Sequence, residues 1–498
     1  MKKIILLHLI SDQNRSLTRN GEKHLNILTT VNKLLSNHYY SYLVSRITKI
    51  IIILLSCFDI IHDVTKDIAN SLNLMINIPL TDKKRIVIVG CGFAGLTLAK
   101  KLRKANYQVV IIDKHNYHQF QPLFYQIASA GLDASSITFP IRKVFQEYND
   151  FYIRKAEVNE VNVSDNELNT SKGTIRYDYL VLAHGATNSF FGSDKMQQYS
   201  KGMKSIAEAL DLRNTLLMNF ENAVATTDME EQERLLNIVI IGGGPSGVEI
   251  AGALAEMNKF VIHKDYPELK DKAANIYLVE GTDRLLNAMS RESSEKARQF
   301  LEKVGVRVMT GTFASDCDDK SVTTSTGEII KTGLILWTAG IAGNKLKGFS
   351  QESYGRGGRL YVDRFSRVKG YDNIFALGDI SLMTEEKYPS GHPQVAQVAI
   401  QQAKLLSENL INLSNSKPLK EFSYKDLGTM ATVGKNLAVV ELPHFRFQGA
   451  FAWFVWLFIH LMSIIGVKNK LMIFINWAWK YFTYDQSLRL ILRPKGCA

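Results

Sequence analysis

The sequence predicts an α/β fold in which one doubly wound module occurs twice and a helical region follows. Three observations support this prediction. Two turns of the form G-x-G-x-x-G each follow a buried β-branched run and precede a helical pattern. Strand and helix patterns alternate from Lys84 onward. Two strongly apolar segments lie near the end of the chain, at about residues 450–482.

The length and composition limit the class of protein. A chain of 498 residues is too long for one core, so two or three domains are expected. The net charge of +12 suits either nucleic acid or an anionic membrane surface. No long Lys/Arg block or nucleic-acid motif occurs, so we expect membrane contact and no nucleic acid. The four cysteines are Cys57, Cys91, Cys317 and Cys497. They show neither a C-x-x-C pair nor the spacing of metal ligands, which predicts a reducing compartment and no bound metal.

Residues 1–83 differ from the rest of the chain because they show no steady periodicity. The first residues resemble a signal peptide, but His8 and a polar run interrupt the pattern early. The apolar stretch 50–58 is too short to span a bilayer. Met75, just before the first strand, is a natural start. We therefore expect residues 1–83 to be a poorly ordered leader or a mis-assigned start.

The first module begins with the apolar strand 86–89 and continues into Gly90, Gly92 and Gly95. Such glycines permit a tight turn and bring backbone N–H groups close to a pyrophosphate, next to the positive end of a helix dipole. A second strand ends at Asp113, 18 residues past Gly95. A carboxylate at that place accepts hydrogen bonds from ribose hydroxyls, unless it merely ends an exposed strand.

The second module repeats this pattern with Gly242, Gly244 and Gly247. Its strand ends at Glu280, 33 residues past Gly247, because the charged stretch 258–272 intervenes as an insertion at a helix end. Glu280 would repel a 2′-phosphate, so this site is expected to prefer NADH over NADPH, unless the acid merely ends a strand. Two such modules suggest two dinucleotides held together, as electron transfer between them requires.

The order of the patterns also predicts discontinuous domains. A strand at 177–183 belongs to the first module, the second module closes at 334–340, and a buried strand at 373–379 returns to the first. The expected parts are an extension at 1–83, the first nucleotide domain at 84–205 and 341–400, the second at 206–340, and a C-terminal region at 401–498.

With these landmarks the chain resembles the glutathione-reductase-like flavoproteins with two Rossmann-like dinucleotide-binding domains, and among them the type II, non-pumping NADH:quinone oxidoreductases. The resemblance covers about Lys84 to Leu492 and rests on segments 113–126, 242–256, 378–379, 393–401 and 427–434. It implies non-covalent FAD at Gly90, Gly92, Gly95, Asp113, Thr187, Gly378, Asp379, Ala396 and Gln397. It implies NADH at Gly242, Gly244, Gly247, Glu280 and Gly340.

Three residues are candidates for catalysis. Glu249 follows the second turn, and in the family the corresponding carboxylate is linked to nicotinamide and proton handling; its ordinary alternative is an acid near a helix N-terminus. Gln397 and Gln401 are four residues apart, so both amides project from one helix face. They suit a flavin pyrimidine oxygen or a quinone carbonyl, with a solvated polar stripe as the alternative.

The chain departs from the family pattern at three positions. His184 stands where a small residue such as Thr is usual, and we expect it to be a packing variant rather than a catalytic base. Lys435 replaces a common Arg and keeps the charge, and Ala403 replaces a frequent glycine.

The C-terminal region is expected to form amphipathic helices that contact a membrane. Residues 451–467 are strongly apolar with one His, and residues 471–482 contain two Trp. Aromatic residues and flanking cations suit the headgroup boundary, and from Lys435 onward eight Lys/Arg stand against two Asp/Glu. The resemblance implies a monotopic arrangement, while a single spanning helix and a homodimer contact remain open.

The resemblance implies an FAD enzyme that oxidises NADH and reduces a membrane quinone, ubiquinone or menaquinone, without ion pumping. Such an enzyme would feed a respiratory chain from the cytoplasmic face of the inner membrane. Two alternatives are a membrane-attached NADH-responsive redox sensor and an enzyme similar to sulfide:quinone oxidoreductases. The latter would need paired redox cysteines, for which Cys317 has no obvious partner.

Overall fold

The computed structural model describes residues 46, 76–269, 272, 274–483 and 488–492. The chain divides into two units, Met1–Met75 and Ile76–Ala498, and the second unit contains both glycine turns. Of the predicted leader, residues 1–83, only residues 46 and 76–83 are among those described. Its last part contacts the folded body, because Ile76 and Ile78 are buried and the N–H of Ile76 donates to the carbonyl of Thr174 at 2.8 Å.

The first parallel sheet has the strand order β20-β9-β1-β2-β5. Its strands are β1 (Arg85–Val89), β2 (Gln108–Asp113), β5 (Phe151–Lys155), β9 (Tyr179–Leu182) and β20 (Ile374–Ala376). Strand β1 is central and buried along Ile86–Val89, as its β-branched run predicts. Helices α4 (Phe93–Lys101) and α13 (Ala396–Ser414) pack together beside it. Strand β20 joins this sheet although it follows the second module in sequence.

The second parallel sheet has the order β13-β12-β11-β17. Its strands are β11 (Ile238–Ile241), β12 (Ile276–Glu280), β13 (Val306–Thr310) and β17 (Leu334–Trp337). Its associated helices are α8 (Ile206–Ala225), α9 (Met229–Leu236), α10 (Pro245–Met257), the π-helical Asn258–Ile262, α11 (His263–Asp265) and α12 (Arg291–Lys303). A small core on one side of this sheet includes Val239, Met196 of α7 (Asp194–Tyr199) and Val322 of an antiparallel sheet. That antiparallel sheet is β14 (Ala314–Cys317), β15 (Ser321–Thr324) and β16 (Ile329–Lys331).

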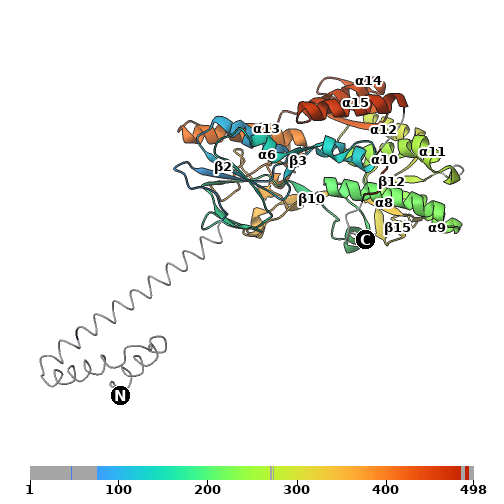
Figure 1. Ribbon diagram of the computed structural model, residues 1–498, viewed down its shortest axis with the longest axis horizontal. Coiled ribbons are helices and arrows are strands. Elements are labelled where there is room, and N and C mark those ends of the chain that lie inside the picture. Colours follow the sequence, from blue (N-terminus) through green and yellow to red (C-terminus); the bar gives the residue numbers. More distant parts are fainter. Residues whose placement is uncertain (1–45, 47–75, 270–271, 273, 484–487, 493–498) are drawn as a thin grey trace, which may run out of the picture. The chain divides into compact units, whose positions relative to one another are not determined.

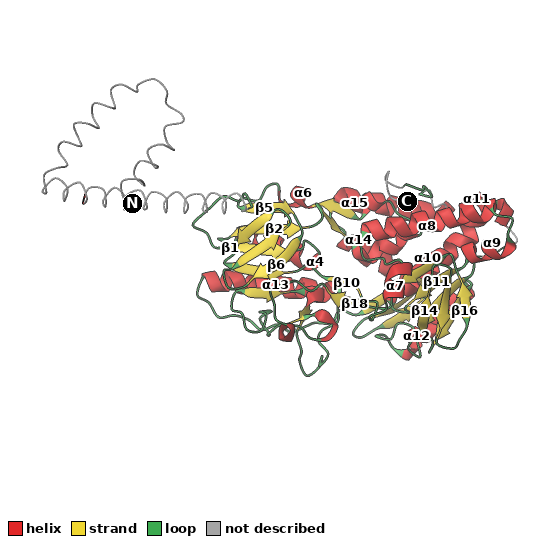
Figure 2. Ribbon diagram, turned by 90° about the horizontal axis from the view of Figure 1, so that it is seen from below, coloured by secondary structure: helices red, strands yellow, loops and turns green. Residues whose placement is uncertain are grey.

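A two-stranded antiparallel ribbon connects the two halves of this unit. Strand β10 (Ala186–Asn188) pairs with β18 (Ile341–Gly343), and Figure 2 shows this ribbon between the group of β1 and the group of β11. The first half also contains β3 (Tyr117–Gln119), β4 (Thr138–Pro140), β6 (Val158–Asn162), β7 (Glu167–Thr170), β8 (Gly173–Arg176), β19 (Leu360–Tyr361), β21 (Ser381–Leu382) and α6 (Ile141–Phe145). Helix α5 (Phe124–Ala128) packs instead on α8 and α10 of the second half. The predicted α/β architecture with two parallel sheets is confirmed.

The C-terminal region combines a small sheet with two apolar helices. The sheet consists of β22 (Thr429–Gly434), β23 (Leu437–Glu441) and β24 (Arg446–Gln448). Helices α14 (Ala450–Ser463) and α15 (Val467–Thr483) contact each other and lie side by side in Figure 1. Strand β22 packs on α10 so closely that a Cβ at Gly252 would lie 1.9 Å from the carbonyl oxygen of Val433. Within the described ranges, every helix is too short or too polar to cross a bilayer.

Candidate active site

The first glycine turn lies at the carboxyl end of β1 and leads into α4. Asp113, at the end of β2, accepts hydrogen bonds from the N–H of Cys91 at 2.6 Å and from the N–H of His115 at 2.7 Å. A Cβ at Gly95 would lie 1.9 Å from the carbonyl oxygen of Gly90, so the helix approaches the turn only because residue 95 is glycine. The predicted residues Gly90, Gly95 and Asp113 therefore belong to one compact turn.

The second turn repeats this geometry at the carboxyl end of β11. Glu280 accepts hydrogen bonds from the N–H of Gly243 at 2.6 Å and from the N–H of Thr282 at 2.7 Å. A Cβ at Gly247 would lie 1.8 Å from the carbonyl oxygen of Gly242. The hydroxyl of Thr338 donates to that same carbonyl at 2.9 Å, a contact that the sequence analysis missed.

Each turn leaves open space at its middle glycine. Gly92 and Gly244 are the N-caps of α4 and α10, and no heavy atom lies within 4 Å of a Cβ built on either residue. A side chain would fill this space, where the unpaired N–H groups of a helix N-terminus converge. The residues present therefore fit one dinucleotide at each turn.

Gly378 lies where α4 and α13 meet. A Cβ at Gly378 would lie 3.1 Å from the Cβ of Ala399, and its N–H donates to the buried amide oxygen of Gln402 at 2.7 Å. Gln402 was not among the residues predicted from the sequence, which on this helix were Gln397 and Gln401. The buried positions of α13 are the signal for it, because Gln402 lies on its core face with Ala399.

The remaining residues predicted for the flavin lie directly after Gly378, at the start of α13 and on β10. Burial raises the pKa of Asp379, and the positive charges of Lys204 and Arg359 oppose that rise. Lys204, another residue that the sequence analysis missed, therefore lies near Asp379. Ala396 is the first residue of α13, so its N–H has no acceptor within that helix. Thr187 is exposed on β10, opposite Ala342 of β18.

The amides of Gln397 and Gln401 hold one backbone segment, residues 425–428, against α13. Gln397 donates to the carbonyl of Gly428 and accepts from the N–H of Leu427, both at 3.0 Å. Gln401 donates to the carbonyl of Lys425 at 2.8 Å and accepts from its N–H at 3.0 Å. Each amide thus makes one hydrogen bond through its oxygen and one through its nitrogen within the protein.

Glu249 is half-buried on α10, between the second glycine turn and the C-terminal region. Removal from water raises the pKa of its carboxyl to about 8, while the backbone of Thr432 and the indole of Trp456 oppose that rise. Trp456 is a fully buried residue of α14 and stacks on His460 at a centroid distance of 3.8 Å. Burial lowers the pKa of His460 to about 4. An apolar C-terminal helix thus reaches Glu249 with an uncharged aromatic pair.

A polar contact also joins α15 to residues close to Glu249. The indole of Trp477 on α15 donates to Gln126 at 2.8 Å, and Gln126 donates to the hydroxyl of Tyr125 at 2.8 Å. Burial, and then the charge of Glu249, raise the pKa of Tyr125 well above its ordinary value. Tyr125 therefore remains a neutral phenol beside Glu249.

The three departures from the family pattern have structural contacts. Nε2 of His184 lies 2.8 Å from the carbonyl of Asn344, and burial lowers the pKa of His184 to about 4. A neutral ring must carry its proton on the nitrogen that faces a carbonyl. The ammonium of Lys435 donates to the carbonyl of Tyr481 at 2.6 Å and so ties β22 to α15. Ala403 is fully buried in the core with α4.

A cavity of about 410 Å³ opens beside the second turn. Its floor includes Gly242 and Glu280, and its walls include Phe191 and Phe313. A Cβ at Gly340 would lie 2.5 Å from the ring of Phe191, so this ring covers the glycine that was predicted to contact NADH.

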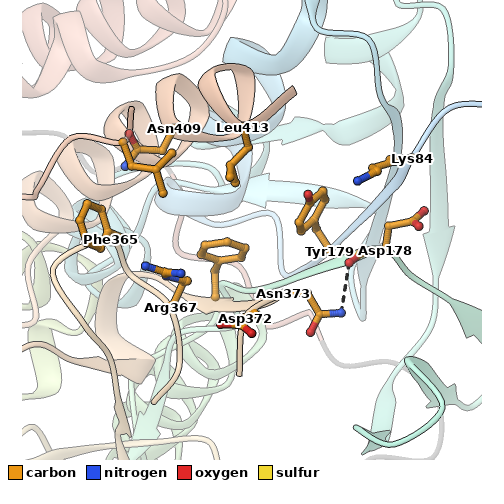
Figure 3. Close-up of a pocket in the computed structure, with 11 residues that line it drawn as sticks. Lys84, Asp178, Tyr179, Phe365, Arg367, Asp372, Asn373, Asn409 and Leu413 are labelled. Carbon is orange, nitrogen blue, oxygen red and sulfur yellow. Dashed lines mark hydrogen bonds between the residues drawn. The ribbon is translucent and has the colours of Figure 1, made fainter. Parts of the chain in front are cut away.

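Another cavity, of about 390 Å³, lies at the opposite end of the first sheet (Figure 3). Lys84, Asp178 and Asn373 line it, immediately before β1, β9 and β20 begin. The amide of Asn373 donates to the carbonyl of Asp178 at 3.1 Å. Because the glycine turns lie at the carboxyl ends of the strands, this cavity is separate from both turns.

Two family models match consecutive parts of the chain. The model described as pyridine nucleotide-disulphide oxidoreductase matches residues 84–403. The model described as NDH2 C-terminal domain matches residues 427–483, which include β22 to α15. The matched ranges thus contain both glycine turns and both apolar helices.

Proteins similar in sequence to this chain are NADH:quinone and NAD(P)H-ubiquinone oxidoreductases. A type II NADH:quinone oxidoreductase of Mycobacterium tuberculosis is 32% identical over 410 residues, covering 79% of this chain and 87% of its own. A mitochondrial internal alternative NAD(P)H-ubiquinone oxidoreductase of Arabidopsis thaliana is 28% identical, covering 80% and 84%. The structure of NDH2 from Plasmodium falciparum in complex with NADH superposes with a TM-score of 0.76 at 21% identity, over 82% of this chain and all of that one. This last likeness concerns the fold.

Proposed function

The chain belongs to the type II NADH:quinone oxidoreductases, and from this premise we propose which of its residues carry out NADH oxidation and quinone reduction. The enzyme binds a flavin and NADH, and it resembles relatives that are NADH:quinone oxidoreductases. The observation that carries our proposal is the position of Glu249, between the NADH turn and the buried Trp456 of an apolar helix.

We assign FAD, bound non-covalently, to the first turn. The open space at Gly92 and the carboxylate of Asp113 suit the adenosine diphosphate half of a dinucleotide. Gly378, Asp379 and the N-terminus of α13 with Ala396 would hold the remainder, together with Thr187 of β10. Bound flavin supplies the hydride acceptor that the reaction requires.

We assign NADH to the second turn, at Gly242, Gly244 and Gly247. Glu280 already orients both carboxylate oxygens toward backbone N–H groups, so its charge lies beside the adenosine ribose position. A phosphate at the 2′ position would approach this carboxylate and be repelled. NADH is therefore the expected donor over NADPH.

Glu249 has the environment of a proton donor to the quinone. With a pKa of about 8, the carboxyl holds its proton at neutral pH and releases it when a basic oxygen forms nearby. The neutral Tyr125 and the neutral His460 beside Trp456 leave Glu249 as the titratable group of this cluster near pH 7. For Gln397 and Gln401 we propose a positioning role, since their amides fix residues 425–428.

Helices α14 and α15 present the surface that would meet lipid. Large apolar side chains stay exposed on both helices: Phe451, Phe454, Phe458, Ile459, Met462, Val467, Leu471, Met472, Phe474, Ile475, Trp479 and Phe482. A patch of this size marks a membrane or protein contact. We propose lipid, in one leaflet, because quinone is lipid-soluble and α14 reaches Glu249. The cytoplasmic face of the inner membrane is the proposed location.

Vesicle flotation tests this surface. The double substitution Phe458→Ser and Phe474→Ser should shift most of the protein from floated vesicles to the soluble fraction while flavin content stays normal. The single substitution Met229→Ser, at another exposed apolar residue, is the control. If the double variant instead floats normally and changes from dimer to monomer in light scattering, the surface is a subunit interface.

Two rival functions predict different behaviour. A mechanism like that of sulfide:quinone oxidoreductases needs paired cysteines, whereas Cys91 and Cys317, within the described part of the chain, are both free and buried. A redox sensor would be reduced once by NADH and then stall. The enzyme is supported if NADH is consumed steadily and this consumption depends on a short-chain quinone. The same protein should release FAD when it is denatured. Absence of flavin from the purified protein would contradict the proposal.

A further inference from the structure

The cavity beside the second glycine turn has two aromatic walls open to solvent. The side chains of Phe191 and Phe313 are 73% and 58% exposed, and both line this cavity of about 410 Å³. Exposed Phe rings on one concave surface leave apolar area in water that a ligand can cover. The floor between them contains Gly242 and Glu280, so the cavity begins at the nucleotide turn.

Phe191 is held in place by a demanding backbone. Its φ of +52° lies in the left-handed region, which is unfavourable for a residue other than Gly and persists where neighbours fix it. Its ring lies against Gly340 and 6.0 Å from the ring of Trp337. The indole of Trp337 in turn donates to the carbonyl of Ser189 at 2.8 Å. The fold thus maintains an exposed ring at a strained position.

Phe313 is fixed from the other side. Its N–H donates to the hydroxyl oxygen of Ser325 at 3.2 Å, and its carbonyl accepts the N–H of Ser325 at 2.8 Å. Its Cβ lies 3.6 Å from a Cβ built on Gly281, the residue after Glu280. Phe313 therefore lies beside the residue that follows Glu280, whose carboxylate we assign to the adenosine ribose.

We infer that Phe191 and Phe313 are the walls of an adenine subsite and determine affinity for the adenosine half of NADH. Purine rings stack on aromatic side chains, and such contacts select a flat ring without reading its hydrogen-bonding edge. Glu280 takes the ribose, and the two rings take the base. This inference rests on the proposed function only in that NADH is the nucleotide.

Binding of ADP-ribose, which contains the adenosine half of NADH and cannot be oxidised, tests the subsite without turnover. Calorimetry on the full-length protein in detergent compares the variants Phe313→Ala and Phe191→Gly with the unchanged chain. Glycine accepts the left-handed backbone at residue 191, so the ring is removed without new strain. Each variant should bind ADP-ribose about tenfold more weakly, as expected for the loss of one stacked ring. Reduced nicotinamide mononucleotide, which lacks adenosine, should keep its KM.

The controls separate this inference from the proposed function. Phe445→Ala removes a ring that is 69% exposed outside the cavity and should leave ADP-ribose affinity unchanged. Phe313→Tyr should restore it, and flavin content should be normal in every variant. Affinities within twofold of the unchanged chain in both Phe191→Gly and Phe313→Ala would overturn the inference alone. If the unchanged chain binds neither ADP-ribose nor NADH, the proposed function fails with it.

Discussion

The two glycine turns share their hydrogen bonds but differ in their surroundings. In each turn, the carboxylate at the end of the following strand accepts a hydrogen bond from the N–H of the turn's second residue. The distance from this nitrogen to the carboxylate oxygen is 2.6 Å for both Asp113 and Glu280. After the first turn, Ala94 is buried at the start of α4. At the same place on α10, Ser246 is exposed and a cavity opens beside the turn. In the proposed assignment, one local arrangement therefore serves both the bound FAD and the NADH that exchanges.

The largest effect is expected where the second helix meets the C-terminal sheet, a contact without a counterpart on α4. Gly252→Ala would place a Cβ 1.9 Å from the carbonyl of Val433. Forcing these backbones apart should destabilise the protein by about 3 kcal/mol or more, because overpacking against rigid backbone is poorly relieved. Thermal unfolding should show this as a clear fall in Tm. Ser246→Ala, on the exposed side of the same helix, should leave Tm within a degree or two, and an equal loss there would contradict the packing argument.

The second prediction concerns the matching helical positions Thr97 and Glu249, seven residues past the first glycine of each turn. Only the second helix has a carboxyl there. Glu249→Gln should lower the rate of quinone reduction by about 10²-fold, the usual range for one proton-transferring group. In the unchanged enzyme the rate should fall above about pH 8, where Glu249 loses its proton, and this limb should be absent from the variant. Thr97→Ser should keep the rate and the limb.

The stability of the Glu249→Gln variant has a defined sign. Because burial raises the pKa of Glu249 to about 8, the folded state holds a proton that the unfolded chain releases above the ordinary value. The unchanged protein should therefore lose Tm as pH rises toward 8, and Glu249→Gln should lose less. Parallel Tm curves for the two proteins between pH 6 and 9 would show that Glu249 titrates normally.

The smallest predicted effect separates the two ribose carboxylates. Glu280→Gln removes the charge but keeps an acceptor for Gly243, so the preference for NADH over NADPH should fall by about tenfold, or roughly 1.4 kcal/mol. Asp113→Asn makes the same change at the first turn and should leave nicotinamide selectivity unaltered. The ratio of kcat/KM values for the two donors measures this. Unchanged discrimination in Glu280→Gln would refute the ribose assignment.

The sequence was sufficient for features encoded by local patterns. Gly90–Gly95 and Gly242–Gly247 form turns of the predicted kind, because glycine spacing and β-branched runs act over a few residues. Contacts between distant segments were not predictable in this way. Gln402, adjacent to the chosen Gln401, holds Gly378, and the direction of its side chain depends on how α13 packs against α4.

The same limit applies to Glu249. Glu249 could be selected as a candidate from the sequence. Its neighbour Trp456 could not, because it is 207 positions away on a helix whose sequence indicates only that it is apolar. Likewise, Gln397 and Gln401 share a helix face as predicted, yet their partners at 425–428 depend on the path of the following loop. The spacing of the two amides predicts that they share a helix face, but it does not determine which groups they bind.

The most direct measurement compares Gly92→Ala with Gly244→Ala. Both residues cap a helix, have an ordinary extended φ of −72°, and leave a Cβ free of protein contacts, so each substitution alters only the space for a nucleotide. FAD released per chain and NADH affinity should be determined for both. We predict that Gly92→Ala loses FAD, whereas Gly244→Ala keeps it and binds NADH at least tenfold more weakly. Normal FAD in Gly92→Ala, or its loss from Gly244→Ala, would contradict the assignment of the two turns.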